Sequence, residues 1–210
     1  MNMSRRPGLA YQYAFDWLAG QLQTVGGSSA CLVPSLFQGV ELLRRLPKIT
    51  FLDPILTEID LARTELGFSQ NEQETIDGSF AAIAWAEPRR GDEEHLAMLV
   101  ERLAFQGRLY IVAGGPLARF LAEQRSNNED LLPASHIRKR LKRFDLRLVH
   151  AFGLYGFGSI SWHYAGQALG GLGRQNWQDR CHYGMRRAYV VHGRGHSNTA
   201  LVCLTVEHSA

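Results

Sequence analysis

The sequence lacks the patterns of several protein classes. Its cysteines, Cys31, Cys181 and Cys203, are an odd and scattered set with no Cys-x-x-Cys, which argues against a disulfide framework and a zinc knuckle. No apolar run approaches the roughly 18 uncharged residues of a membrane-spanning helix, and no apolar segment follows the basic start as in a signal peptide. No histidine spacing matches a metal template. We therefore expect a soluble, cytoplasmic protein with no membrane association and no bound metal.

Length and composition predict one globular domain. The 210 residues are 45% hydrophobic and 20% charged, and chains of roughly 100–200 residues usually form a single core. No repeat or long linker divides the chain. We expect a single domain over residues 1–210, with an N-terminal helix within residues 1–27 and an insert rich in glycine and aromatic residues at 156–187.

Charge is distributed unevenly along the chain. Residues 1–133 carry 12 basic and 17 acidic side chains, whereas residues 134–210 carry 11 basic and three acidic ones. Most of the basic excess lies in residues 136–143, where apolar residues recur at helical spacing and leave the cations on the outer face. A solvated helix face and a surface for an anionic partner both remain open. Because the cationic face holds no stacking aromatic side chain, we expect no specific nucleic-acid binding.

Strand and helix patterns alternate through most of the chain. Short apolar runs closed by proline, glycine or aspartate are typical of buried strands, and longer stretches with apolar residues every three or four positions are typical of helices. This alternation predicts an α/β fold in which helices cover both faces of a mostly parallel sheet. The expected helices span residues 8–22, 36–46, 56–66, 95–103 and 136–143, and the expected strands span 30–33, 49–52, 80–85, 108–112, 146–155 and 200–206.

The stretch between the last two strands has no clear period. A connection of this length without secondary structure is uncommon unless it is functional. Its glycine residues are not followed by Lys-Ser or Lys-Thr, so they do not form a phosphate loop. We expect a flexible surface segment or the hinge of a lid. Residues 188–191 are expected to pair with the last strand through a turn at 193–195.

Several segments resemble class I S-adenosylmethionine-dependent methyltransferases. Residues 49–54, followed by 61–63, are similar to the second strand of that family and the helix after it. Residues 77–80 resemble the entry to the fourth strand, and residues 103–111 resemble the helix, turn and strand that lead into the fifth. The resemblance covers roughly residues 30–155.

This resemblance implies a Rossmann-like, doubly wound sheet whose antiparallel close is formed by residues 146–155 and 200–206. It also implies S-adenosylmethionine as the cofactor and a small-molecule acceptor as the substrate of methyl transfer. A homo-oligomer and a protein partner remain open.

Two departures from the family pattern leave a second function open. In the family the first strand ends in a glycine-rich turn, because the donor lies against bare backbone. Residues 33–39 hold one glycine, a proline and a phenylalanine, and lack the acid that often orients the methionine ammonium. Only residues 64–79 lie between segment 61–63 and the strand expected at 80–85, which resembles the family's fourth strand. The family's third strand, which lies at the edge of the sheet, is therefore expected to be shortened or absent. The alternative is therefore a non-catalytic binding or assembly module with the same fold.

The resemblance implies a donor site at the carboxyl ends of the strands. Asp53 is implied to receive the ribose hydroxyls, with helix capping as its alternative role. Gly39, in the turn after the first strand, and Trp85, at the end of the fourth, are the other implied donor contacts. Burial in the core is the alternative for Trp85.

The expected acceptor site lies under a lid made of the N-terminal helix and the insert. Its candidate residues are Trp17, Tyr155 and Trp162. His163, which is set among aromatic residues, is a candidate base, with a structural histidine as the alternative. Methyl transfer depends on in-line positioning, so the reaction does not require a base.

Overall fold

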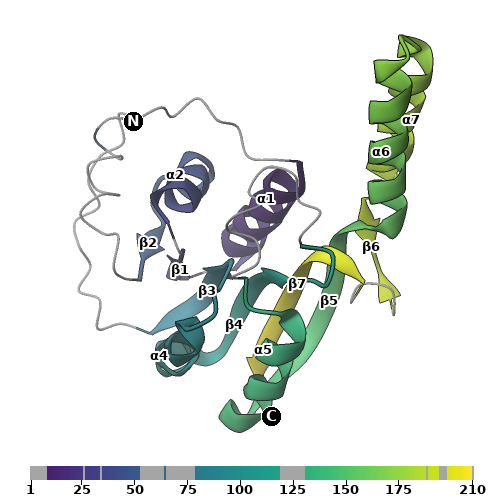
Figure 1. Ribbon diagram of the computed structural model, residues 1–210. Helices are drawn as coiled ribbons and strands as arrows, with labels where there is room; N and C mark the ends of the chain where they lie inside the picture. Colours follow the sequence, from purple (N-terminus) through teal and green to yellow (C-terminus); the bar gives the residue numbers. More distant parts are fainter. Residues whose placement is uncertain are drawn as a thin grey trace.

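Seven strands form one mixed sheet in the computed structural model (Figure 1), which describes residues 9–25, 27–33, 35–52, 64, 79–118, 131–187, 189–193 and 198–209. Their order is β2-β1-β3-β4-β7-β5-β6. The first four strands run parallel, β7 lies antiparallel between β4 and β5, and β6 pairs antiparallel with β5. The bounds are β1 (Ser29–Leu32), β2 (Thr50–Phe51), β3 (Phe80–Ala86), β4 (Leu103–Gly114), β5 (Leu146–Gly156), β6 (Val190–Val191) and β7 (Thr199–His208). The prediction of a mostly parallel sheet with an antiparallel C-terminal strand is confirmed.

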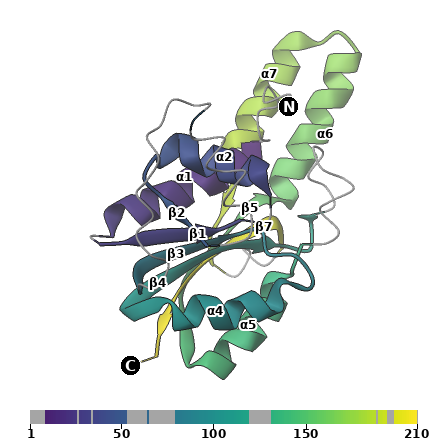
Figure 2. The same ribbon diagram turned by 90° about the vertical axis from the view of Figure 1, so that its left-hand side faces the viewer.

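Helices cover both faces of this sheet, as predicted (Figure 2). Helices α1 (Leu9–Thr24) and α2 (Leu36–Arg45) lie on one face, and α4 (His95–Glu101) and α5 (Ala134–Leu141) lie on the other. Each face has its own hydrophobic cluster. Five strand residues, from β1 to β4, illustrate this burial on both faces: Leu32, Phe51, Ile83, Leu109 and Ile111.

Strand β3 shows why the sheet is apolar on both sides. Ala82, Ala84 and Ala86 belong to the cluster under α1 and α2, whereas Ile83 and Trp85 belong to the cluster under α4 and α5. Because successive strand residues point to opposite faces, the small residues leave room for α1 while the large ones fill the other layer.

The basic helix forms as predicted, as α5 followed by a short 3-10 turn at Lys142–Phe144. Ile137 and Leu141 are buried on its inner face. The helix expected over residues 56–66 lies outside the described residues except for Thr64. Within the described part of the chain no helix is long and apolar enough to span a bilayer.

The insert is helical, so the expectation of a flexible segment or lid hinge is wrong. Helices α6 (Phe157–Gly171) and α7 (Gln175–Arg187) form an antiparallel pair that extends away from the sheet (Figure 1). A Cβ added at Gly166 would lie 3.2 Å from the Cβ of Cys181, and one at Gly184 would lie 2.8 Å from the Trp162 indole. These glycines lower helix propensity by about 1 kcal/mol each, but they allow the two helices to pack closely.

The pairing expected for residues 188–191 is also wrong. β6 pairs with β5, through Gly153 with Val191 and Leu154 with Val190. β7 lies between β4 and β5, so both of its edges are already hydrogen-bonded. The free edge of β5 is therefore where a strand returning from α7 adds to the sheet. The turn expected at residues 193–195 lies mostly outside the described residues.

Candidate functional site

The connections place a topological switch point between β1 and β3. From β1 the chain passes through α2 to β2 on one side, and β3 then adds to the other side of β1. In open α/β sheets, ligands bind in the crevice at the carboxyl ends of strands at such a point. The residues that directly follow β1 and β3 therefore form the candidate site.

Two buried polar side chains meet at this point. Gln38 lies in the first turn of α2, and Glu87 directly follows β3. Gln38 Nε2 donates a hydrogen bond of 2.7 Å to Glu87 Oε2. Only 2% of Gln38 and 3% of Glu87 is exposed, which is rare for these residue types.

This pair leaves two acceptor atoms without a partner. Gln38 Oε1 and Glu87 Oε1 are both buried and accept no hydrogen bond from any described residue. A buried polar atom left in this way costs about 1–3 kcal/mol. When Glu87 is ionised both oxygens are acceptors, so a group that satisfies both would be a hydrogen-bond donor such as an amine or ammonium.

Burial raises the pKa of Glu87 to about 7, although the hydrogen bond from Gln38 and the charge of Arg89 oppose the shift. The backbone of Glu87 is left-handed, with φ at 52°, and its N–H donates to Val112 O at 2.9 Å. A residue other than glycine is strained in that conformation, and such strain is concentrated at functional sites. The surrounding structure thus holds a titratable carboxyl in a costly position at the switch point.

The predicted donor residues are only partly placed near this pair. Gly39 follows Gln38 in α2 and is buried, and its N–H donates to Ser35 O at 3.1 Å within the first helical turn. Trp85 is 2% exposed and packs in the cluster under α4 and α5. Asp53 lies outside the described residues.

Among the predicted acceptor residues, the structure brings Tyr155 and His163 together. Their ring centroids are 6.3 Å apart, edge to face, at the carboxyl end of β5. Burial is the first cause that raises the pKa of Tyr155 to about 12, so this phenol stays neutral and can donate a hydrogen bond. His163 Nε2 lies 3.0 Å from Gln167 Nε2, which occupies that ring nitrogen within α6.

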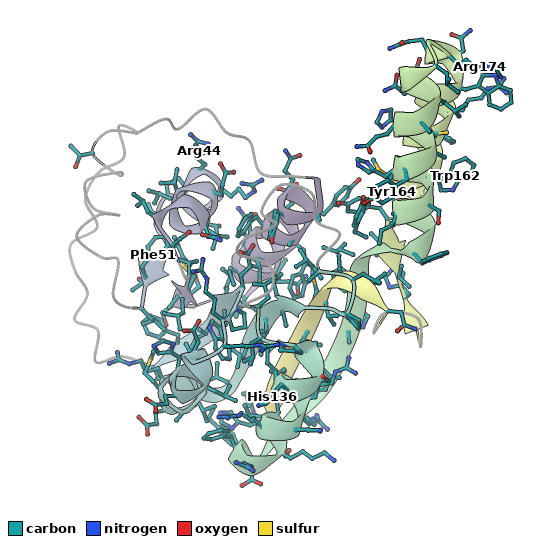
Figure 3. The ribbon with its side chains drawn as sticks, viewed as in Figure 1. Arg44, Phe51, His136, Trp162, Tyr164 and Arg174 are labelled. Atoms are coloured by element: carbon teal, nitrogen blue, oxygen red, sulfur yellow. The ribbon has the colours of Figure 1, made fainter. Side chains whose placement is uncertain are left out.

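Trp17 and Trp162 pack against other neighbours. Trp162 extends from a different side of α6 than Tyr164 and packs on Gly184 (Figure 3). Trp17 lines a cavity of about 600 Å³ over the α1 face of the sheet, together with rings from β5 and the segment after β6. The Trp17 and Phe152 rings pack edge to face, with their centroids 5.3 Å apart.

Glu87 and Gln38 were not among the residues predicted from the sequence. The usable signal was the Glu-Pro pair that closes the buried run of β3, because the first polar residue after a parallel strand lies at the ligand-binding edge. Gln38 gave no such signal, since a glutamine in a helix is ordinary. In the described ranges no group of three histidine, cysteine, aspartate or glutamate residues could hold a metal ion.

No protein-family model matches the sequence. A search of curated proteins also finds no match. Solved structures do match over nearly the whole chain. A protein from Galdieria sulphuraria assigned as a sarcosine dimethylglycine methyltransferase aligns with a TM-score of 0.54 at 11% identity, over 94% of this chain and 86% of the other.

Two further structures agree with that match. The glycopeptide N-methyltransferase MtfA in complex with S-adenosylmethionine aligns with a TM-score of 0.53 at 10% identity, over 99% of both chains. An S-adenosylmethionine-dependent methyltransferase from Clostridium acetobutylicum aligns at 0.53 and 11% identity, over 97% of this chain and 94% of the other. The chain has the class I methyltransferase fold. Gln38 and Glu87 lie beside the carboxyl ends of β1 and β3 in this fold, the part of open α/β sheets where ligands generally bind.

Proposed function

We propose that the protein is an S-adenosylmethionine-dependent methyltransferase that acts on a small-molecule acceptor. The observation that carries this proposal is the buried pair of Gln38 and Glu87 at the switch point, with two acceptor oxygens that no described residue satisfies. A fold alone does not determine a function, so the proposal rests on this site.

The residues of the pair fit the amino-acid end of the cofactor. S-adenosylmethionine supplies a methyl group activated on a sulfonium, and its methionine part carries an ammonium with three donors. Gln38 Oε1 and Glu87 Oε1 are two buried acceptors for such a group, and an ionised Glu87 also supplies the opposite charge. The acid that residues 33–39 lack is thus supplied by the neighbouring strand.

The acceptor would bind at the same edge of the sheet, near Tyr155. The carboxyl ends of β3 and β5 are three strand spacings apart in the sheet order, or roughly 14 Å. The neutral phenol of Tyr155 can hold an acceptor by a hydrogen bond, and the ring of His163 packs beside it. Positioning of the acceptor for in-line attack then supplies much of the catalysis.

Calorimetric titration tests this proposal. Wild-type protein is titrated with S-adenosylmethionine and with methylthioadenosine, which lacks the amino-acid part. We expect Glu87→Gln to weaken S-adenosylmethionine binding about 5- to 150-fold, the equivalent of roughly 1–3 kcal/mol, and to leave methylthioadenosine binding unchanged. Glu101→Gln, at an exposed glutamate of α4, is the matched control. Absence of any heat with millimolar S-adenosylmethionine would remove the basis of the proposal.

The second candidate is a non-catalytic binding module. It is favoured because the segment after β1 differs from the glycine-rich turn of the family. Residues 33–39 hold a single glycine, and the buried Gln38 side chain lies where the family has bare backbone. The same titration separates the two functions, because a module without a donor site binds neither ligand.

A further inference from the structure

The pair of helices α6 and α7 exposes an unusual amount of apolar surface. Six of the 11 large hydrophobic side chains exposed among the described residues belong to this pair or to its connecting turn. Helix α6 contains no aspartate, glutamate, lysine or arginine along its 15 residues. A solvent-facing helix normally carries charge on its outer side, so this composition indicates a covered surface.

Five of the exposed residues of α6, together with the exposed Leu172 that follows the helix, form a stripe on the side away from α7. The inner side is fixed by the contact of Gly166 with Cys181, and by the Ser159 hydroxyl, which donates to Met185 O at 3.2 Å. Apart from the adjacent pair Tyr164 and Ala165, the residues of this stripe recur every three or four positions, the spacing of a helix-packing seam. This outer stripe consists of Phe157, Ser161, Tyr164, Ala165, Ala168 and Leu172, all exposed.

The outer stripe is suited to burial against another helix. Phe157 is 75% exposed, Tyr164 47% and Leu172 73%, so three large side chains alternate with small ones. The Ser161 hydroxyl already donates to Phe157 O at 2.9 Å, so its burial leaves no unsatisfied donor. Large side chains beside small ones are what allows facing helices to interdigitate.

We propose that the outer stripe is the contact between two copies of this chain, whose α6 helices pack antiparallel about a twofold axis. An axis between Tyr164 and Ala165 puts Phe157 opposite the partner's Leu172 and Ser161 opposite the partner's Ala168. It puts Tyr164 opposite the partner's Ala165. The stripe is therefore complementary to itself, which is what a twofold contact requires.

Charge and surface area both favour a second copy of the chain as the partner of the outer stripe. The α7 sequence contains three arginines, Arg180, Arg186 and Arg187, against one acid, so a twofold contact through α7 would bring like charges together, whereas one through α6 brings none. Arg174 lies at the far end of the pair (Figure 3). Six exposed side chains of these sizes offer on the order of 500 Å² per chain, or about 1,000 Å² for two, the lower limit for a specific interface. An interface of this size is typical of a weak, reversible dimer.

Sedimentation velocity from about 1 to about 100 µM tests the dimer. We expect wild type to dimerise within this range, and both Tyr164→Glu and Ala168→Glu to remain monomeric with unchanged circular dichroism and thermal unfolding. Tyr183→Glu, at an exposed tyrosine of α7, is the matched control and keeps the dimer. A wild type that is monomeric at about 100 µM, or a dimer that survives both α6 substitutions, overturns the proposal.

Disulfide trapping tests the antiparallel register. The three native cysteines are buried, so only an introduced surface cysteine should form a crosslink between chains. Ala165→Cys lies beside the axis, so mild oxidation should give a covalent dimer. Phe157→Cys lies far from its copy and should give none. Efficient trapping through Phe157→Cys would instead indicate parallel helices and contradict the proposed axis. A monomeric chain that binds anionic lipid vesicles through this stripe would assign it to a membrane surface and refute the dimer.

Discussion

Replacing Glu87 by glutamine tests the electrostatics of the site through stability alone. The folded-state pKa of about 7 exceeds the ordinary value of 4.5 because the carboxyl is buried. Between these two values the folded chain holds a proton that the unfolded chain releases. The stabilising contribution of the protonated carboxyl is therefore complete below the unfolded pKa and is lost as pH rises through the folded pKa.

The size of the Glu87 pKa shift determines how much the unfolding free energy changes with pH. A pKa raised by roughly 2.5 units corresponds to about 3 kcal/mol of unfolding free energy, most of which is lost between pH 5 and 8. Glutamine does not titrate, keeps the acceptor for Gln38 Nε2 and has a similar shape. We therefore expect Glu87→Gln to gain about 2–3 kcal/mol relative to wild type as the pH rises from 5 to 8.

Urea denaturation at several pH values measures this difference. Every other titrating group contributes equally to both proteins, so the pH dependence of the difference isolates Glu87. Glu101→Gln, at an exposed glutamate, serves as the control and should follow wild type at each pH. A difference between Glu87→Gln and wild type that stays constant from pH 5 to 8 would show that the carboxyl is not held protonated by burial, and the reasoning about the site would fail.

Four further predictions follow from the same structure. S-adenosylmethionine affinity should rise about tenfold from pH 6 to 8 in calorimetry, as Glu87 ionises to receive the ammonium, and flat affinity would contradict that role. Asp53→Ala should weaken binding by roughly 1–3 kcal/mol if this acid holds the ribose hydroxyls, and an unchanged affinity would favour its role as a cap. Gly115→Ala should lower the unfolding free energy by about 2–3 kcal/mol, because its Cβ would clash with the Thr199 carbonyl oxygen, while Gly171→Ala, with open space around it, should not. Helix α5 should give no tight complex with nucleic acid in a gel shift at about 50 mM salt, and a complex that weakens steeply with salt would reassign that face to a polyanion.

The alternation of apolar segments was sufficient to predict most of the fold. Strand β3 is a nearly unbroken apolar run because both of its faces are buried, and β7 is buried over most of its length for the same reason. The basic helix was predicted correctly, since its apolar residues Ile137 and Leu141 keep helical spacing. These patterns are local in the sequence, and each is supported by several residues of the same segment.

The insert was misread because glycine has two opposite uses. Glycines are ordinarily signals of turns and flexible segments, and α6 has several of them. In the structure Gly166 and Gly170 lie four residues apart on one helical face, where the absence of a side chain lets Cys181 and Gln178 approach. A single sequence does not separate these uses, because the partner helix that makes the small residue favourable follows later in the chain.

The candidate site was only partly predictable, for a related reason. The resemblance directed attention to the loop after β1, where the family has its glycines and acid. The buried carboxyl instead follows β3, and its significance depends on Gln38, which is 49 positions away in the sequence and 2.7 Å away in the fold. What makes Glu87 notable is its near-complete burial, its raised pKa and its left-handed backbone, none of which a residue type reveals.

These features of Glu87 all reduce the stability of the folded chain without a ligand. A left-handed glutamate costs on the order of 1–3 kcal/mol, two unsatisfied acceptors cost more, and ionisation at neutral pH costs more again. A cation that donates hydrogen bonds to both oxygens relieves the last two costs at once, because it satisfies the acceptors and compensates the charge. The site is therefore poised to bind such a group, and the same carboxyl that weakens the free protein above pH 7 strengthens its complex. Stability in the absence of ligand and affinity for it should accordingly change in opposite directions when Glu87 is replaced by glutamine.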